Sequence, residues 1–162
     1  MDACSCPTEA GATTCERASA PATIRACPAC GKPGKRVEQR TLKGLLAVPL
    51  TQLRDVEYRF CRTPDCAVVY FSVDGAQRFD EDAVRERVFQ KHPADDDALV
   101  CYCFRHTVGS IRSRHDVPAG GSVIAEIQAG IQAGQCACDI RNPQGSCCLG
   151  NVRSVADSTR GS

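Results

Sequence analysis

The chain has 162 residues, with 20 basic and 19 acidic side chains and 13 cysteines. This near balance of charge argues against a protein that binds nucleic acid or an acidic membrane surface. Aromatic residues make up only 5% of the chain and Trp is absent. We therefore expect a thin apolar core that something other than hydrophobic burial must stabilise.

The N-terminal segment, residues 1–22, is rich in Ala, Thr, Ser and Pro and is predicted to be a disordered tail. It has no basic start followed by an apolar run, so no secretory signal is predicted, and no membrane insertion is expected. A cytoplasmic location follows as an expectation, and reduced cysteines there bind metals more often than they form disulfides. The tail thiols Cys4, Cys6 and Cys15 are interpreted as free, with capture of a soft ion such as Cu(I) as the alternative.

Residues 23–91 are predicted to form a small β-rich unit. Short β-forming runs at 35–39, 56–60 and 67–73 alternate with turn-forming Pro, Gly and Asp residues. The following segment, 79–91, is compatible with both a helix and a strand.

Two cysteine pairs lie within this unit, "CPAC" at Cys27 and Cys30 and "CRTPDC" at Cys61 and Cys66. Two such knuckles that meet across a small β unit are typical of a closed structural zinc site with four thiolates. A redox-active C-x-x-C motif is the alternative, but it is not favoured because no βαβ pattern surrounds the motif. A closed site leaves no position for a substrate, so this zinc is expected to organise the fold.

An acidic, Pro-containing segment, 92–99, is predicted to link this unit to a helical unit at 100–156, with a disordered tail at 157–162. Thr107 and Ser122 are predicted helix N-caps. Apolar side chains at helical spacing are expected on the inner faces of the second and third helices: Val123, Ile124, Ile127 and Ile131, then Leu149, Val152 and Val155. The predicted class is α+β, a zinc-bound β unit followed by a short helical 2Fe–2S unit.

A second group of cysteines begins with "VCYCFRHT", where Cys101 and Cys103 are one residue apart. In an extended segment both sulfurs face the same side, so both are expected to bind one iron of a 2Fe–2S cluster, which needs four thiolates. His106 and His115 are interpreted as surface or helix-end residues, because Rieske-type C-x-H pairs are absent. The remaining cluster ligands are sought among four cysteines downstream: Cys136, Cys138, Cys147 and Cys148.

The combined pattern "CPAC…FCRTPDCAVVYF…VCYCFRHT…CDIRNPQGSCCLGNV" resembles the N-terminal domain of the CopZ-type copper chaperones over about residues 24–156. The C-terminal half also resembles bacterioferritin-associated ferredoxin. The resemblance implies one zinc ion and one 2Fe–2S cluster, with two sets of ligands. The zinc set is Cys27, Cys30, Cys61 and Cys66, and the cluster set is Cys101, Cys103, Cys138 and Cys148. Cys136 and Cys147 remain open as replacements for Cys138 and Cys148.

The function that the resemblance implies is one-electron transfer in copper homeostasis, such as reduction of Cu(II) to Cu(I) for delivery to a partner. Expected partners are copper or another soft metal ion, and a metal-transporting ATPase or a separate copper-binding protein. The sequence departs from the full-length chaperones because its only Met is Met1, so it has no M-x-C-x-x-C copper loop. No catalytic triad or phosphate loop indicates an independent enzyme. The alternative function is a binding module that senses or sequesters metals or oxidants.

Overall fold

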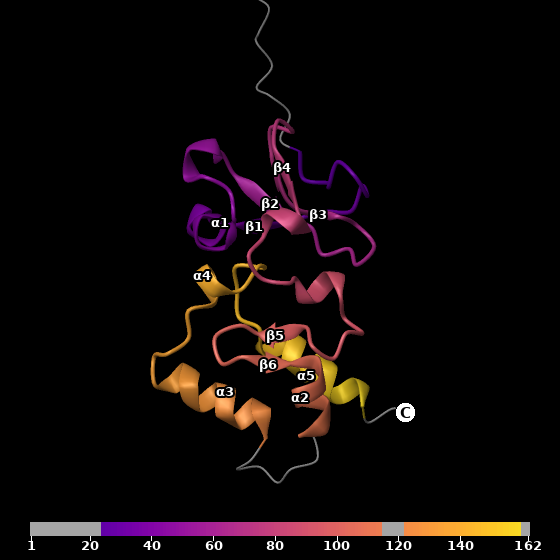
Figure 1. Cartoon of the computed structure of the whole chain (residues 1–162), viewed down its shortest axis with the longest axis vertical. Coiled ribbons are helices and arrows are strands. Elements are labelled where there is room, and N and C mark those ends of the chain that lie inside the picture. The colour runs from indigo at the N-terminus through magenta and orange to yellow at the C-terminus, as the bar shows by residue number, and fades with distance from the viewer. Residues whose placement is uncertain (1–23, 115–121, 160–162) are drawn as a thin grey trace, which may run out of the picture.

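The computed structural model describes residues 24–114 and 122–159 of the protein. Several sequence predictions concern residues outside these ranges, namely the tail at 1–22 with its thiols Cys4, Cys6 and Cys15, and His115. Within the described residues the protein is a mixed helix and sheet structure, which confirms the predicted α+β class. In Figure 1 a four-stranded sheet lies at one end of the molecule and most of the helices lie at the other.

The sheet is antiparallel, and its strands follow one another in chain order. The strands are β1 (Lys35–Val37), β2 (Tyr58–Phe60), β3 (Val68–Ser72) and β4 (Arg78–Asp80). β1, β2 and β3 fall inside the three predicted β-forming runs. Every residue of β3 is buried, which explains why its sequence is a continuous run with little alternation.

A short helix that the sequence analysis did not predict, α1 (Gln39–Leu45), follows β1. Its buried residues Thr41, Leu42 and Leu45 lie on one face and cover the core. Local propensity is weak here, because Gly44 lies within the helix and no side chain caps its start. Packing against the rest of the protein therefore stabilises α1.

The segment 79–91, which was compatible with both a helix and a strand, forms most of β4 and two 3₁₀ turns, Glu81–Ala83 and Phe89–Lys91.

The second half begins with a hairpin of β5 (Leu99–Cys101) and β6 (His106–Thr107). His106 is 6% exposed and therefore not a surface residue, but it directly precedes Thr107, the N-cap of the next helix, so it lies at a helix end as the other interpretation had it. The described residues that follow contain the helices α2 (Val108–Ser113), α3 (Val123–Gln132), α4 (Cys138–Arg141) and α5 (Leu149–Ser158).

Both predicted N-caps are confirmed. The Thr107 hydroxyl accepts a hydrogen bond from the Ser110 amide at 3.2 Å, and the Ser110 hydroxyl accepts one from the Thr107 amide. The Ser122 hydroxyl accepts a hydrogen bond from the Ala125 amide.

Most of the apolar residues predicted on the inner faces of α3 and α5 lie in the core, but Ile131 is exposed. The α5 helix continues to Ser158, beyond the predicted end of the helical unit at residue 156.

The two halves pack against each other where α1 meets α4 (Figure 1). The Thr41 hydroxyl donates to the carbonyl of Asp139 at 2.6 Å, and the buried Tyr70 hydroxyl donates to the carbonyl of Pro143 at 2.7 Å. A Cβ atom added at Gly44 would lie only 2.8 Å from the carbonyl oxygen of Ile140, so the two helices are in close contact there. None of the helices that the structure describes has the length and apolar character that a membrane span requires.

Candidate metal centres

The four cysteines of the predicted zinc set come together at one end of the sheet. Cys27 and Cys30 precede β1, Cys61 follows β2 directly, and Cys66 precedes β3. The Sγ atoms of Cys27 and Cys66 are 3.8 Å apart, those of Cys30 and Cys61 are 3.6 Å apart, and all four lie within 4.8 Å of one another. A tetrahedral zinc ion with Zn–S bonds of about 2.3 Å needs sulfurs about 3.8 Å apart. The geometry therefore fits a closed Cys₄ zinc site.

A tight turn shapes the first knuckle. The amide of Gly31 donates to the carbonyl of Cys27 at 2.8 Å, and the amide of Cys27 donates to the carbonyl of Lys32 at 2.8 Å. Gly31 has φ +69°, a left-handed conformation that glycine adopts without steric cost. This turn directs the thiols of Cys27 and Cys30 towards the second knuckle.

Burial and hydrogen bonding act in opposite directions on these thiols. The Cys30 Sγ lies 3.3 Å from the Thr63 hydroxyl, and this hydrogen bond lowers the pKa of Cys30 to about 6. Burial raises the pKa of Cys66 to about 12 and also raises the pKa of Cys27. A bound cation is thus needed to keep Cys27 and Cys66 as thiolates, so binding releases protons.

Lys91 is a buried cation beside the second knuckle, and the sequence analysis missed it. Its side chain is 8% exposed in total, and its ammonium group donates to the carbonyl of Thr63 at 2.8 Å. Thr63 lies between the ligands Cys61 and Cys66. Four thiolates and one Zn²⁺ carry a net charge of −2, so a nearby cation stabilises the loaded site. Lys91 lies in a segment whose sequence pattern was ambiguous, and no local signal indicated its burial.

The second group of cysteines lies between the β5–β6 hairpin and the starts of α4 and α5. The Sγ of Cys103 is 3.7 Å from that of Cys138, and the Sγ of Cys136 is 3.4 Å from that of Cys138. Cys101, Cys138 and Cys148 are buried in one cluster of side chains, and Cys103 and Cys136 pack against it. The sulfurs of Cys103, Cys136 and Cys138 lie within 4.8 Å of one another, whereas Cys147 is exposed.

The contacts in this group link sulfurs from different segments. β5 ends at Cys101, and Cys103 lies in the turn that follows, which contains Arg105 at φ 62°. The rule that residues i and i+2 of a strand face the same side therefore does not apply to this pair. The Sγ atoms of Cys103 and Cys138 are 3.7 Å apart, so sulfurs from distant segments come together, and the placement of Cys101 and Cys103 on one iron stays a prediction.

Backbone amides surround the second group and favour negative charge. The amide of Ala137 donates to the Cys103 sulfur at 3.3 Å, and Cys138 and Cys148 lie at the starts of α4 and α5. Hydrogen bonding with Cys148 lowers the pKa of Cys138 to about 5 and that of Cys101 to about 7. Burial raises the pKa of Cys103 to about 12.

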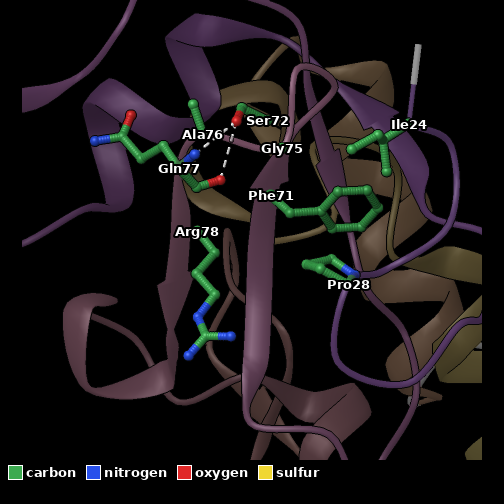
Figure 2. A pocket seen from close by; sticks show the side chains of 8 residues that line it. All are labelled: Ile24, Pro28, Phe71, Ser72, Gly75, Ala76, Gln77 and Arg78. Atoms are coloured by element: carbon green, nitrogen blue, oxygen red, sulfur yellow. Dashed lines mark hydrogen bonds between the residues drawn. The ribbon is translucent and has the colours of Figure 1, made fainter. Parts of the chain in front are cut away.

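A pocket of about 290 Å³ lies beside the first metal centre. Figure 2 shows the ring of Phe71 pointing towards Pro28, the residue that follows Cys27. Phe71 also packs in the cluster of buried residues that contains the zinc ligands. The pocket is lined by Ile24, Pro28, Phe71, Ser72, Gly75, Ala76, Gln77 and Arg78, so it contains no acid, His or Cys that would carry out catalysis.

Comparisons with known proteins agree with the first centre. The family model of a zinc binding domain, zf_CopZ, matches residues 24–85. The X-ray structure of the N-terminal domain of CopZ from Archaeoglobus fulgidus is similar to this chain, with a TM-score of 0.62 and 25% identity, over 80% of this chain and 96% of that one. No curated protein matches the chain significantly. Residues 24–85 thus form a zinc-binding domain of the CopZ type.

Proposed function

We propose that the protein combines its zinc site with a 2Fe–2S cluster and transfers single electrons in the handling of copper or another soft metal ion. The observation that carries this proposal is the convergence of thiols in the second half, at helix starts and beside backbone amides. A 2Fe–2S cluster requires four thiolates and carries negative charge, and both conditions fit this donor set. The proposed cluster ligands are Cys101, Cys103, Cys138 and Cys148.

The chain's own residues would hold and tune such a cluster. Cys101 and Cys148 would hold it with buried thiols, and Cys103 would hold it with a half-buried one. The Ala137 amide, which donates to the Cys103 sulfur, would stabilise the reduced state because that state carries more negative charge. When bound, a 2Fe–2S cluster accepts and releases one electron.

Copper enters this proposal as a substrate. One electron leaves the reduced protein and converts one Cu(II) to Cu(I), the form that thiolate ligands prefer. A one-electron donor protein then restores the reduced state. A metal-transporting ATPase or a separate copper-binding protein would receive the Cu(I). In this proposal the protein is a cytoplasmic carrier of electrons and not an independent enzyme.

The proposal is tested by metal analysis and EPR of the protein purified without oxygen and reduced with dithionite. We expect about one zinc and two irons per chain, because there are two separate sets of thiols. The reduced protein should convert Cu(II) to Cu(I), detected with a Cu(I)-specific chromogenic chelator. Zinc in both sites with no inorganic sulfide, even after cluster reconstitution, would rule out the cluster.

A matched pair of variants tests the ligand set. Cys148→Ala should abolish the 2Fe–2S spectrum, whereas Cys147→Ala should retain it, because Cys148 is buried among the other sulfurs and Cys147 is exposed. The reverse result would shift the ligand assignment by one residue.

A further inference from the structure

The second centre contains one more sulfur than a 2Fe–2S cluster needs. The Sγ atom of Cys136 is 3.4 Å from that of Cys138, and Cys103, Cys136 and Cys138 all lie within 4.8 Å of one another. The Sγ atom of Cys136 is nearer to that of Cys138 than the Sγ atom of Cys103 is. The extra thiol therefore belongs to a compact set of three.

The spacing of this set fits a single ion with three thiolate ligands. With metal–sulfur bonds of about 2.3 Å, a trigonal arrangement needs sulfurs about 4.0 Å apart. The two closest pairs in the structure are 3.4 Å and 3.7 Å apart. The third pair lies within 4.8 Å, so all three spacings are close to the value that the ion needs.

The surroundings of the set also favour metal capture. Cys103 and Cys136 are half-buried, so an ion reaches them without opening the core. The amide of Ala137, between the other two ligands in the chain, donates to the Cys103 sulfur at 3.3 Å. A soft set of three thiolates, with no carboxylate or imidazole in it, selects Cu(I) over hard cations.

We propose that Cys103, Cys136 and Cys138 form a three-thiolate site for Cu(I), which the protein uses when it holds no cluster. Binding exchanges thiol protons for the ion, and no electrons are transferred. Because Cys103 and Cys138 are also proposed cluster ligands, the site deepens the proposed function: the cluster and this Cu(I) ion exclude each other. The protein would thereby respond to excess Cu(I) through the occupancy of one set of sulfurs.

The experiment uses full-length, zinc-loaded, cluster-free protein, kept reduced and without oxygen. The tail thiols are removed by Cys4→Ser, Cys6→Ser and Cys15→Ser so that they do not compete. Cu(I) is titrated in competition with bathocuproine disulfonate. Cys136→Ser should weaken the tightest Cu(I) binding at least about tenfold, because one of three soft ligands is lost. The control Cys147→Ser, which removes an exposed neighbouring thiol, should leave the affinity unchanged.

Two further measurements complete the test. X-ray absorption of the protein with one Cu(I) should show three sulfur neighbours, and reconstitution of the cluster should remove this binding. Unchanged affinity in Cys136→Ser, or an equal loss in Cys147→Ser, would overturn the Cu(I) site. Loss of the 2Fe–2S spectrum in Cys136→Ser would instead contradict the ligand set of the proposed function, so the two failures are distinguishable. Retained zinc and an unchanged circular dichroism spectrum show that each variant is folded.

Discussion

At the scale of single residues, Lys91 illustrates how a side chain outside the ligand set supports a metal site. Its ammonium group reaches the carbonyl of Thr63, and the Thr63 hydroxyl lies 3.3 Å from the Cys30 sulfur. The side chain thus holds the backbone of the second knuckle and brings a positive charge near a site of charge −2. Buried groups interact more strongly than exposed ones because water screens them less.

Lys91→Met is therefore predicted to weaken zinc binding by on the order of tenfold, since the Thr63 carbonyl loses a buried charged donor. Competition with a chromogenic zinc chelator measures the change. Lys43→Met is the matched control, because it removes the same charge from an exposed position on α1. Equal affinities in the two variants would show that Lys91 has no special role at the site.

At the scale of elements, the contact between α1 and α4 links the half with the zinc site to the half with the proposed cluster site. The α4 helix begins at the proposed ligand Cys138, and α1 packs against it through Thr41 and Gly44. The absence of a side chain at Gly44 is what allows the approach, because an added Cβ would lie 2.8 Å from the backbone oxygen of Ile140. Backbone atoms cannot rotate away as a flexible side chain can, so α4 itself would have to move.

We predict that Gly44→Ala lowers cluster occupancy while zinc remains bound. The visible absorption of the reconstituted cluster and the zinc content measure the two effects. Gly150→Ala is the control: Gly150 lies in α5 and has no neighbour within 4 Å of an added Cβ. That change should stabilise the protein by about 0.5–1 kcal/mol through helix propensity alone. An unaffected cluster in Gly44→Ala would mean that α4 does not depend on this contact.

The sequence predicted those elements whose signals are local. The β-forming runs around Tyr58 and Val69 and the caps at Thr107 and Ser122 depend on neighbouring residues, and the structure contains all of them. The α1 helix was not predicted, because its stability comes from packing with residues far away in the chain.

The same distinction explains the candidate sites. The zinc set could be predicted because both of its pairs have a recognisable spacing in the sequence. The sequence indicated Cys136 only as a replacement for Cys138, and the placement of both residues together among the sulfurs was not predicted. It depends on how the segment before α4 folds back over the turn that contains Cys103, which only the three-dimensional structure reveals.

At the scale of the whole molecule, the two centres should depend on each other unequally. The zinc unit forms the surface on which α4 and the loop after it rest, because Thr41 bonds to Asp139 in α4 and Tyr70 bonds to Pro143 in that loop. Zinc binding contributes directly to the folding free energy of a small domain whose knuckles are held together by the metal. Loss of zinc should therefore disturb the cluster, whereas loss of the cluster should leave the sheet intact.

Cys61→Ser is accordingly predicted to lower both zinc content and cluster content, and Cys101→Ser to remove the cluster alone. Elemental analysis and visible absorption of the two purified variants measure this asymmetry. If Cys61→Ser kept a full cluster, the two halves would be independent despite their contact. If Cys101→Ser lost its zinc, the dependence would run in the opposite direction as well.

The two glycines at the contact between the halves also restrict how such proteins can evolve. Gly145 has φ +65°, and a Cβ added there would lie 3.0 Å from the Thr41 hydroxyl, much as one at Gly44 would meet Ile140. Each half thus carries a glycine that is required by the other half. Recombination that exchanged one half for a homologous one would succeed only if the incoming partner kept the matching glycine, so the two halves are expected to be inherited together as a single unit.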